Sequence, residues 1–143
     1  SVSGGAGNDT FSAGAGTDTI SGGAGVDTLS GGADADTFVF APGDTSTVAG
    51  SVDRITDFAT ADFVKLGVTG TATNYLEASS GTYTQALSDA SALIQSGSRD
   101  IVAVTVGADV YVFADITSSN TVGLAVHLAG TTVADISQAN FVA

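Results

Sequence analysis

The chain has 143 residues, 43% of them hydrophobic, and its 15 acidic residues outnumber three basic ones, so its formal net charge is −12. This charge excludes nucleic acids and anionic membrane surfaces as partners, because both require clustered lysine and arginine, and it favours divalent cations. The absence of cysteine excludes disulfide bonds, thiolate nucleophiles and zinc–thiolate sites.

Residues 4–39 repeat a nine-residue pattern, G-G-x-G-x-D-x-U-x, in which U is an apolar residue. Each repeat predicts a turn of six residues, in which glycine adopts positive φ, followed by a three-residue strand with one inward side chain. Two repeats complete one coil, so turns one and three should stack on one edge and turns two and four on the other, with parallel strands about 4.8 Å apart. The copies are Gly4–Ser12, Ala13–Ser21, Gly22–Ser30 and Gly31–Val39.

The sixth position of each turn is an aspartate, and glycine-rich turns also expose backbone carbonyls. A stacked pair of turns offers two carboxylates and about four carbonyl oxygens, a set that suits Ca²⁺ rather than Zn²⁺ or copper. This pattern is typical of calcium-binding β-helix repeats. A flexible glycine-rich linker is the alternative interpretation, but a linker needs neither the regular spacing nor the apolar position. The sequence therefore predicts calcium ligands at Asp9, Asp18, Asp27 and Asp36.

The nine-residue spacing extends back to the second residue, because Val2 and Phe11 occupy the same apolar position. Val2 thus belongs to a repeat whose beginning is absent, and the chain contains no methionine, so we expect the natural protein to continue upstream. We interpret residues 1–45 as a β-roll and residues 46–143 as a region that caps its open end.

After Phe38 the nine-residue spacing stops, but acidic residues continue at Asp44, Asp53, Asp57 and Asp62. A strand in this region would place the carboxylates of Asp53 and Asp57 on the same face. The carboxylates of Asp53 and Asp57 either complete calcium sites that the last turns leave half-built or belong to a solvated acidic strand and loop.

One helix and three strands are expected in the C-terminal half. Residues 82–95 place Leu87, Ala90 and Ile94 at helical spacing, which predicts a short amphipathic helix with Thr84 as its N-cap. The predicted strands are 100–106, 109–115 and 121–128, joined by hairpin connections at 107–108 and 117–120.

The sequence contains no set of residues that could catalyse a reaction. A zinc-protease helix requires two histidines, whereas the chain has one. That residue, His127, alternates with core residues and so faces away from the core, in a strand without the glycine pattern of a nucleophile elbow. We therefore expect this fragment to be non-catalytic, although an upstream part could be an enzyme.

The nonapeptides, the segment DRITDF followed by DFVKL, and the tail ISQANFVA together resemble the RTX (repeats-in-toxin) C-terminal regions of secreted bacterial proteins such as serralysins. The resemblance implies an all-β fold: a right-handed parallel β-roll filled with calcium, followed by a C-terminal antiparallel β cap with one short helix. It also implies an uncleaved C-terminal signal for the type I (ABC transporter) secretion machinery, and hence an extracellular location.

The resemblance implies further calcium ligands beyond the four repeat aspartates. Asp53 and Asp57 match acids that close the last sites, and Asp44 lies in the same region. Asp34 replaces the fourth-position glycine of repeat four, where it either adds a carboxylate ligand or distorts the turn. Backbone carbonyl ligands are expected at Gly5, Gly7, Gly14, Gly16, Gly23, Gly25 and Gly32.

The composition favours a surface-layer (S-layer) protein as the parent of this chain. The dominance of threonine, alanine, serine and glycine resembles Caulobacter-type S-layer proteins, which coat cells as a calcium-held lattice, and a parent of that kind would self-associate into such a lattice. The alternative parent is a secreted enzyme such as a metalloprotease, lipase or epimerase, for which this chain would be the C-terminal secretion and folding domain.

Overall fold

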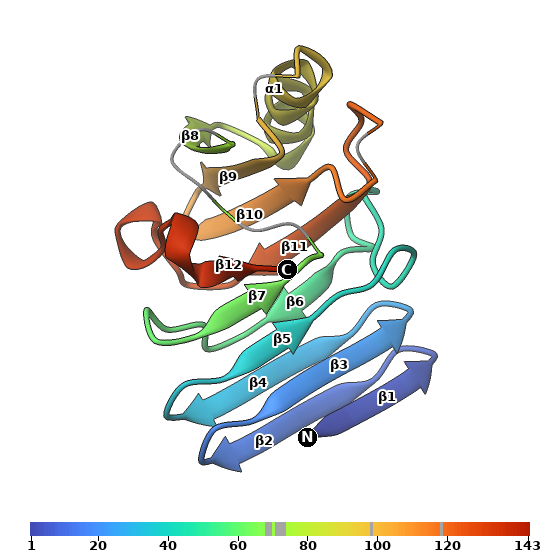
Figure 1. Cartoon of the computed structure of the whole chain (residues 1–143), viewed down its shortest axis with the longest axis vertical. Helices are drawn as coiled ribbons and strands as arrows, with labels where there is room; N and C mark the ends of the chain where they lie inside the picture. Colours follow the sequence, from blue (N-terminus) through green and yellow to red (C-terminus); the bar gives the residue numbers. More distant parts are fainter. Residues whose placement is uncertain (68–69, 71–73, 98, 118) are drawn as a thin grey trace.

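The chain folds into two β-sheets that follow the long axis of the molecule, with a helix at the end far from the N-terminus (Figure 1). This computed structural model describes residues 1–67, 70, 74–97, 99–117 and 119–143. The elements are β1 (Val2–Ala6), β2 (Thr10–Ala15), β3 (Thr19–Ala24), β4 (Thr28–Ala33), β5 (Thr37–Val39), β6 (Asp53–Ile55), β7 (Phe63–Lys65), β8 (Tyr75–Ser80), α1 (Tyr83–Gln95), β9 (Ile101–Val106), β10 (Asp109–Ala114), β11 (Leu124–Leu128), the 3₁₀ helices η1 (Val133–Asp135) and η2 (Gln138–Asn140), and β12 (Phe141–Val142).

The nonapeptide repeats form the predicted parallel β-roll, in which successive strands alternate between the two sheets. One sheet has the order β1-β3-β5-β7-β12 and the other β2-β4-β6-β11-β10-β9-β8. In the first sheet Val2 pairs with Ile20, and in the second Phe11 pairs with Leu29, both in parallel. Each coil therefore spans 18 residues, which confirms the predicted stacking of turns one and three and of turns two and four.

The strands of the roll are longer than the sequence predicts. Each of β2, β3 and β4 has six residues rather than three, because the Gly-Gly-x or Ala-Gly-x part of the next repeat continues the ladder. Gly5 and Gly23, which pair across β1 and β3, have φ of 100° and 93°. The backbones approach so closely that a Cβ on Gly23 would overlap the carbonyl oxygen of Gly5. Glycine is therefore required within the strand as well as in the turn.

The coil continues beyond the repeats through short strands from later in the chain. β6 joins β4 with Ile55 opposite Leu29, and β7 joins β5 with Val64 opposite Phe38. The same positions are then continued by Leu128 of β11 and by Phe141 of β12. Apolar side chains thus form one inward column in each sheet, from the first repeats to the C-terminal residues.

The antiparallel pairing expected of the C-terminal region is present in β9–β10–β11, including the tight connection at 107–108. Parallel pairs flank it, because β11 joins β6 on one side and β8 joins β9 on the other. The connection expected at 117–120 includes residue 118, which lies outside the described residues. The C-terminal half therefore extends the sheets of the roll instead of stacking on them as a wholly antiparallel unit.

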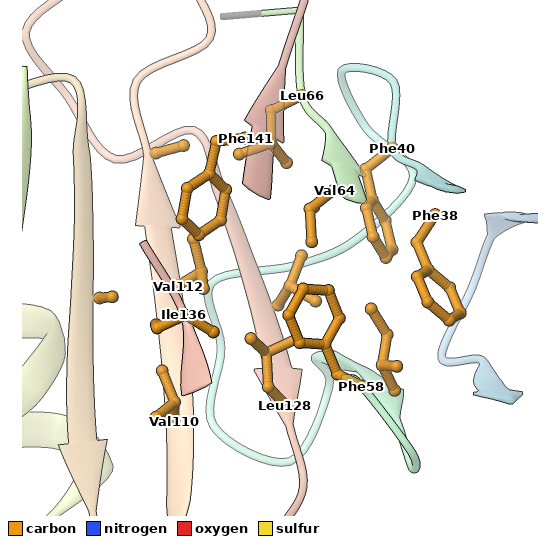
Figure 2. Packing of buried hydrophobic residues seen from close by; sticks show 14 of the residues in the cluster. Phe38, Phe40, Phe58, Val64, Leu66, Val110, Val112, Leu128, Ile136 and Phe141 are labelled. Carbon is orange, nitrogen blue, oxygen red and sulfur yellow. The ribbon is translucent and has the colours of Figure 1, made fainter. Parts of the chain in front are cut away.

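The core lies between the two sheets and is richest in aromatic residues where the repeats end (Figure 2). The rings of Phe38 and Phe58 lie 6.3 Å apart, and those of Tyr75 and Phe141 lie 5.4 Å apart. Phe38 and Phe141 are fully buried. The C-terminal strand therefore shares one core with the last repeat.

Helix α1 covers the outer face of the second sheet. Its buried residues Ala86, Ala90 and Ile94 belong to a cluster with β9 and β10 side chains. Its N-cap is Thr82, whose hydroxyl accepts a hydrogen bond from the Gln85 amide, so the predicted N-cap Thr84 is wrong. The helix begins earlier because Thr82 is extended and can cap the first turn. Among the described residues, no helix has the length and apolar character of a membrane span.

Candidate metal centre

Aspartates on one edge of the roll form a ladder that runs through successive coils. The Asp9 amide donates to Oδ1 of Asp27 at 2.8 Å, and the Asp27 amide donates to Oδ1 of Asp53 at 2.8 Å. The Asp53 amide donates to the Thr45 hydroxyl at 2.9 Å, so a neutral residue ends this ladder. We call Asp9, Asp27 and Asp53 the first ladder.

Aspartates on the opposite edge repeat the same arrangement. The Asp18 amide donates to Oδ1 of Asp36 at 2.8 Å, and the Asp36 amide donates to Oδ1 of Asp62 at 2.9 Å. We call Asp18, Asp36 and Asp62 the second ladder. In both ladders Oδ1 of an aspartate accepts a hydrogen bond from the backbone amide of the preceding coil. Oδ2 of the same aspartate is therefore left for a different partner.

The second carboxylate oxygen is buried and unpartnered at most of these positions. Oδ2 of Asp9, Asp27, Asp36 and Asp53 has no hydrogen-bond partner, and the Asp27, Asp36 and Asp53 side chains are fully buried. A buried carboxylate oxygen without a partner carries a large desolvation penalty, which a bound cation removes. The ladders therefore fit a cation at these oxygens.

The first glycine of the repeat makes room for this oxygen. A Cβ on Gly22 would overlap Oδ2 of Asp27, and a Cβ on Gly31 would overlap Oδ2 of Asp36. Repeat two has Ala13 at this position, and Ala13 packs against the core cluster. The position of the carboxylate oxygen therefore requires glycine in repeats one, three and four.

Carboxylates do not surround a cation by themselves in this arrangement. Within the described residues, no group of three or more His, Cys, Asp or Glu side chains is placed to hold a metal ion. The carbonyl oxygens of Gly5, Gly7 and Gly14 face the glycine of the next coil, so backbone oxygens line the space between turns. Paired carboxylates and carbonyls are the hard oxygen ligands that Ca²⁺ prefers.

Residues 3–38 match the family model of the RTX calcium-binding nonapeptide repeat in four copies. Residues 3–38 therefore form four RTX calcium-binding nonapeptide repeats, and we call the fold that they begin the RTX domain. The chain is similar to a solved structure, the AlgE6R2 subunit of the mannuronan C5-epimerase from Azotobacter vinelandii, with 28% sequence identity and a TM-score of 0.63. The match covers 98% of this chain and 79% of that chain. No curated protein matches the chain.

Asp62 is a ladder member of the RTX domain and lies outside the set of ligands that the sequence predicts. Asp53 and Asp62 are nine residues apart, as are the inward residues Ile55 and Val64. The expectation that the spacing stops after Phe38 is therefore wrong: the spacing resumes at Asp53. Both ladder steps into this coil span 26 residues, eight more than the 18 of a repeat coil. An insertion of eight residues thus hides a continuing pattern.

Asp57 follows β6 in the chain and belongs to neither ladder. Its Oδ2 accepts hydrogen bonds from the Ser30 hydroxyl at 2.7 Å and the Gly32 amide at 2.9 Å, and its Oδ1 accepts from the Gly31 amide at 3.1 Å. Asp57 therefore satisfies polar groups of β4 that follow the part paired with β6. Its predicted role as a calcium ligand stays a prediction.

Asp44 and Asp34 lie beside the stacked turns. Oδ2 of Asp44 accepts from the Ala41 amide at 2.8 Å, and its carbonyl accepts from the Gly25 amide at 3.3 Å. Asp34 adopts the positive φ, 78°, of the glycine it replaces, and its Oδ2 accepts from the Gly16 amide at 3.1 Å. Both residues thus hold neighbouring turns in place, and their role as ligands stays a prediction.

Burial raises the pKa of two ladder carboxyls in the metal-free RTX domain. The pKa of Asp53 rises to about 6, first because the group is buried and then because Asp27 and Asp44 carry like charge, although the hydrogen bond from the Asp27 amide opposes the rise. Burial also raises the pKa of Asp62. Burial therefore disfavours the ionised forms of both groups by more than their hydrogen bonds favour them.

Acidification should stabilise the metal-free RTX domain between about pH 6 and pH 4. Because the folded state binds the Asp53 proton more tightly than the unfolded chain, its contribution is present at low pH and is lost as pH rises through about 6. The contribution is up to about 3 kcal/mol. Asp109 has the opposite effect on the pH dependence of stability, because hydrogen bonds lower its pKa, above all the bond from the Gly130 amide. The stability that Asp109 contributes is lost only below about pH 4.

This pH dependence can be measured by circular dichroism in excess chelator, where little of the roll is expected to fold at pH 7. We expect the natural chain to regain part of the β-structure signal of the roll at pH 5. The variant Asp53→Asn should show a much smaller difference between the two pH values. An equal difference in both proteins would contradict the assignment to Asp53.

Proposed function

We propose that this RTX domain is a non-catalytic module of an extracellular bacterial protein, one that folds when it binds calcium outside the cell. The observation that carries the proposal is the row of buried, unpartnered Oδ2 atoms in the two ladders. In a chain of net charge −12, these oxygens favour the folded state only when cations lie between them. Residues 1–45 therefore supply four of the ladder carboxylates and the glycine carbonyls for calcium, and residues 46–143 supply Asp53 and Asp62 and close the roll.

The substitution Asp27→Asn tests this proposal at the middle of the first ladder. Asparagine keeps an oxygen for the Asp9 amide and has nearly the same volume, so the hydrogen bond is retained while the charge is lost. We expect the calcium concentration at the folding midpoint to rise at least about tenfold, which corresponds to about 1.4 kcal/mol.

The matched control is Asp89→Asn on helix α1, which also removes one negative charge but lies away from the ladders. Calcium titrations followed by circular dichroism, with calorimetric stoichiometry, measure both variants. Equal midpoints for the two variants would refute a ligand role for Asp27.

We also propose that the C-terminal residues form the signal for type I secretion. The tail ISQANFVA supports this proposal, because it resembles the RTX C-terminal regions of secreted bacterial proteins. Ile136 and Phe141 belong to the core, so this tail is part of the folded protein as well. Deletion of residues 136–143 should prevent export by cells that express a type I transporter, as measured by immunoblot of the medium. Deletion of residues 1–18, one coil of the roll, should leave export intact; equal export of both deletions would place the signal elsewhere.

The parent protein is best proposed as a secreted enzyme. The similarity to a subunit of a mannuronan C5-epimerase, over 98% of this chain, favours that parent. Composition alone supports the S-layer alternative. Electron microscopy of the chain in calcium distinguishes them, because an S-layer protein should assemble into sheets, whereas an enzyme tail should stay dispersed.

A further inference from the structure

A pocket of about 310 Å³ lies on the outer face of the second sheet, where the roll meets the C-terminal strands. Its floor is a row of side chains on four neighbouring strands: Thr28 pairs with Arg54, Arg54 with His127, and His127 with Tyr111. Tyr83 of α1 also lines the pocket. The pocket lies on the sheet face opposite the inward core column, and its lining includes Asp27 of the first ladder, so ligand binding is measured with calcium bound.

One wall of the pocket is a stack of three rings. The His127 ring lies parallel to the Tyr111 ring with centroids 4.4 Å apart, and the edge of Tyr83 meets Tyr111 at 4.9 Å. The stack is held at both ends, because Nε2 of His127 lies 2.9 Å from a carboxylate oxygen of Asp109 and the Tyr83 hydroxyl donates to the Thr47 carbonyl at 2.7 Å. A fixed wall of this kind presents a flat surface to a ligand at little entropic cost.

Arg54 supplies a positive charge beside this wall. It is one of only three basic residues in the chain, and its side chain is exposed. In the part of the chain that the structure describes, no carboxylate forms an ion pair with its guanidinium. Its charge helps to lower the pKa of Asp109, so it lies close to the ring stack. A guanidinium without a carboxylate partner can bind a ligand carboxylate in bidentate fashion.

We propose that this pocket binds a small six-membered ring that carries one carboxylate. The carboxylate pairs with Arg54, and the ring lies against the wall formed by His127 and Tyr111, with Val26 and Val52 supplying apolar contact. The volume is at the lower end of the range for ligand pockets, about 300–1,000 Å³, which selects a small ligand. The net charge of −12 disfavours polyanions, which selects a single carboxylate. Acidic sugars and aromatic acids share this chemistry.

Nuclear magnetic resonance of the calcium-loaded chain tests the proposal, because His127 is the only histidine and its ring protons report on the pocket alone. The probes are glucuronate, benzoate and, as a neutral ring, glucose. We expect saturable shifts of the His127 resonances with at least one ring carboxylate, at least about tenfold tighter than with glucose. Whichever of glucuronate and benzoate binds more tightly shows whether the ligand is an acidic sugar or an aromatic acid.

Arg54→Gln should weaken the binding of that carboxylate at least about tenfold. Lys65→Gln is the matched control, because it removes an exposed cation on β7 of the other sheet and should leave binding unchanged. Circular dichroism in calcium verifies that each variant folds, which separates loss of the pocket from failure of the calcium-driven fold. In the natural chain, nuclear Overhauser contacts between ligand ring protons and the His127 ring provide a readout that needs no variant. Absence of a saturable shift with both carboxylates, or equal binding by Arg54→Gln, overturns the proposal.

Discussion

Excess chelator is expected to abolish most of the β-structure of residues 1–45, and calcium is expected to restore it cooperatively. The short glycine-rich strands lose much conformational entropy on folding, and the ladder carboxylates repel each other at net charge −12. Four buried Oδ2 atoms also lose their hydration without gaining a partner. Because calcium binds only the folded roll, each site adds about 2.7 kcal/mol at a hundredfold excess over its dissociation constant.

Circular dichroism of the chain in chelator, calcium and magnesium measures this effect. Magnesium should not restore the signal, because it requires a compact octahedral geometry and gives up its water reluctantly, whereas stacked turns offer carbonyls and carboxylates at fixed places. Sites with dissociation constants of about 10⁻⁴–10⁻³ M would fill outside the cell and stay empty in the cytosol, which keeps the chain threadable for secretion. An unchanged spectrum in excess chelator would show that the roll folds without metal.

Gly23→Ala is expected to destabilise the calcium-loaded roll by about 3 kcal/mol or more. The new Cβ would overlap the carbonyl oxygen of Gly5 in the coil below, and neither backbone can move without breaking the β1–β3 ladder. Gly5→Ala is the matched control, because Gly5 has a similar φ of 100° but open space where its Cβ would lie.

The control isolates close packing from backbone strain. Gly5→Ala should cost about 1–2 kcal/mol, the usual penalty for alanine at positive φ. Urea unfolding of both variants at saturating calcium compares them directly. Equal losses would mean that the backbones are farther apart than the structure places them.

The repeat region was predictable because one local pattern encodes both sheet registers. A spacing of nine places every aspartate at a turn and every apolar residue inside, and two repeats per coil then fix Val2 opposite Ile20 and Phe11 opposite Leu29. The places of the four repeat aspartates in the ladders follow from the same spacing. What the spacing could not show is that glycine continues into the strands, because that depends on the approach of two backbones rather than on one turn.

The next coil was predictable in principle. Asp53 and Asp62 are each followed two residues later by an apolar residue, as in every repeat, and they keep the spacing of nine. The eight-residue insertion before Asp53 breaks the regular spacing from the earlier repeats to this pair. The regular spacing therefore does not predict Asp62 as a ligand. Its place is visible only from the hydrogen bond between its carboxylate and the Asp36 amide.

The amino-acid sequence by itself determined the coil length, the four repeat aspartates of the ladders and the positions of α1, β9, β10 and β11. Only the tertiary structure decided which strands join the roll: Val126 pairs with Asp53, and Phe141 pairs with Val64. Alternating apolar residues show which face of a strand is buried, but they do not select the partner strand when many residues separate the two. The pocket at Arg54 depends on that choice, because its residues become neighbours only after β11 has paired with β6.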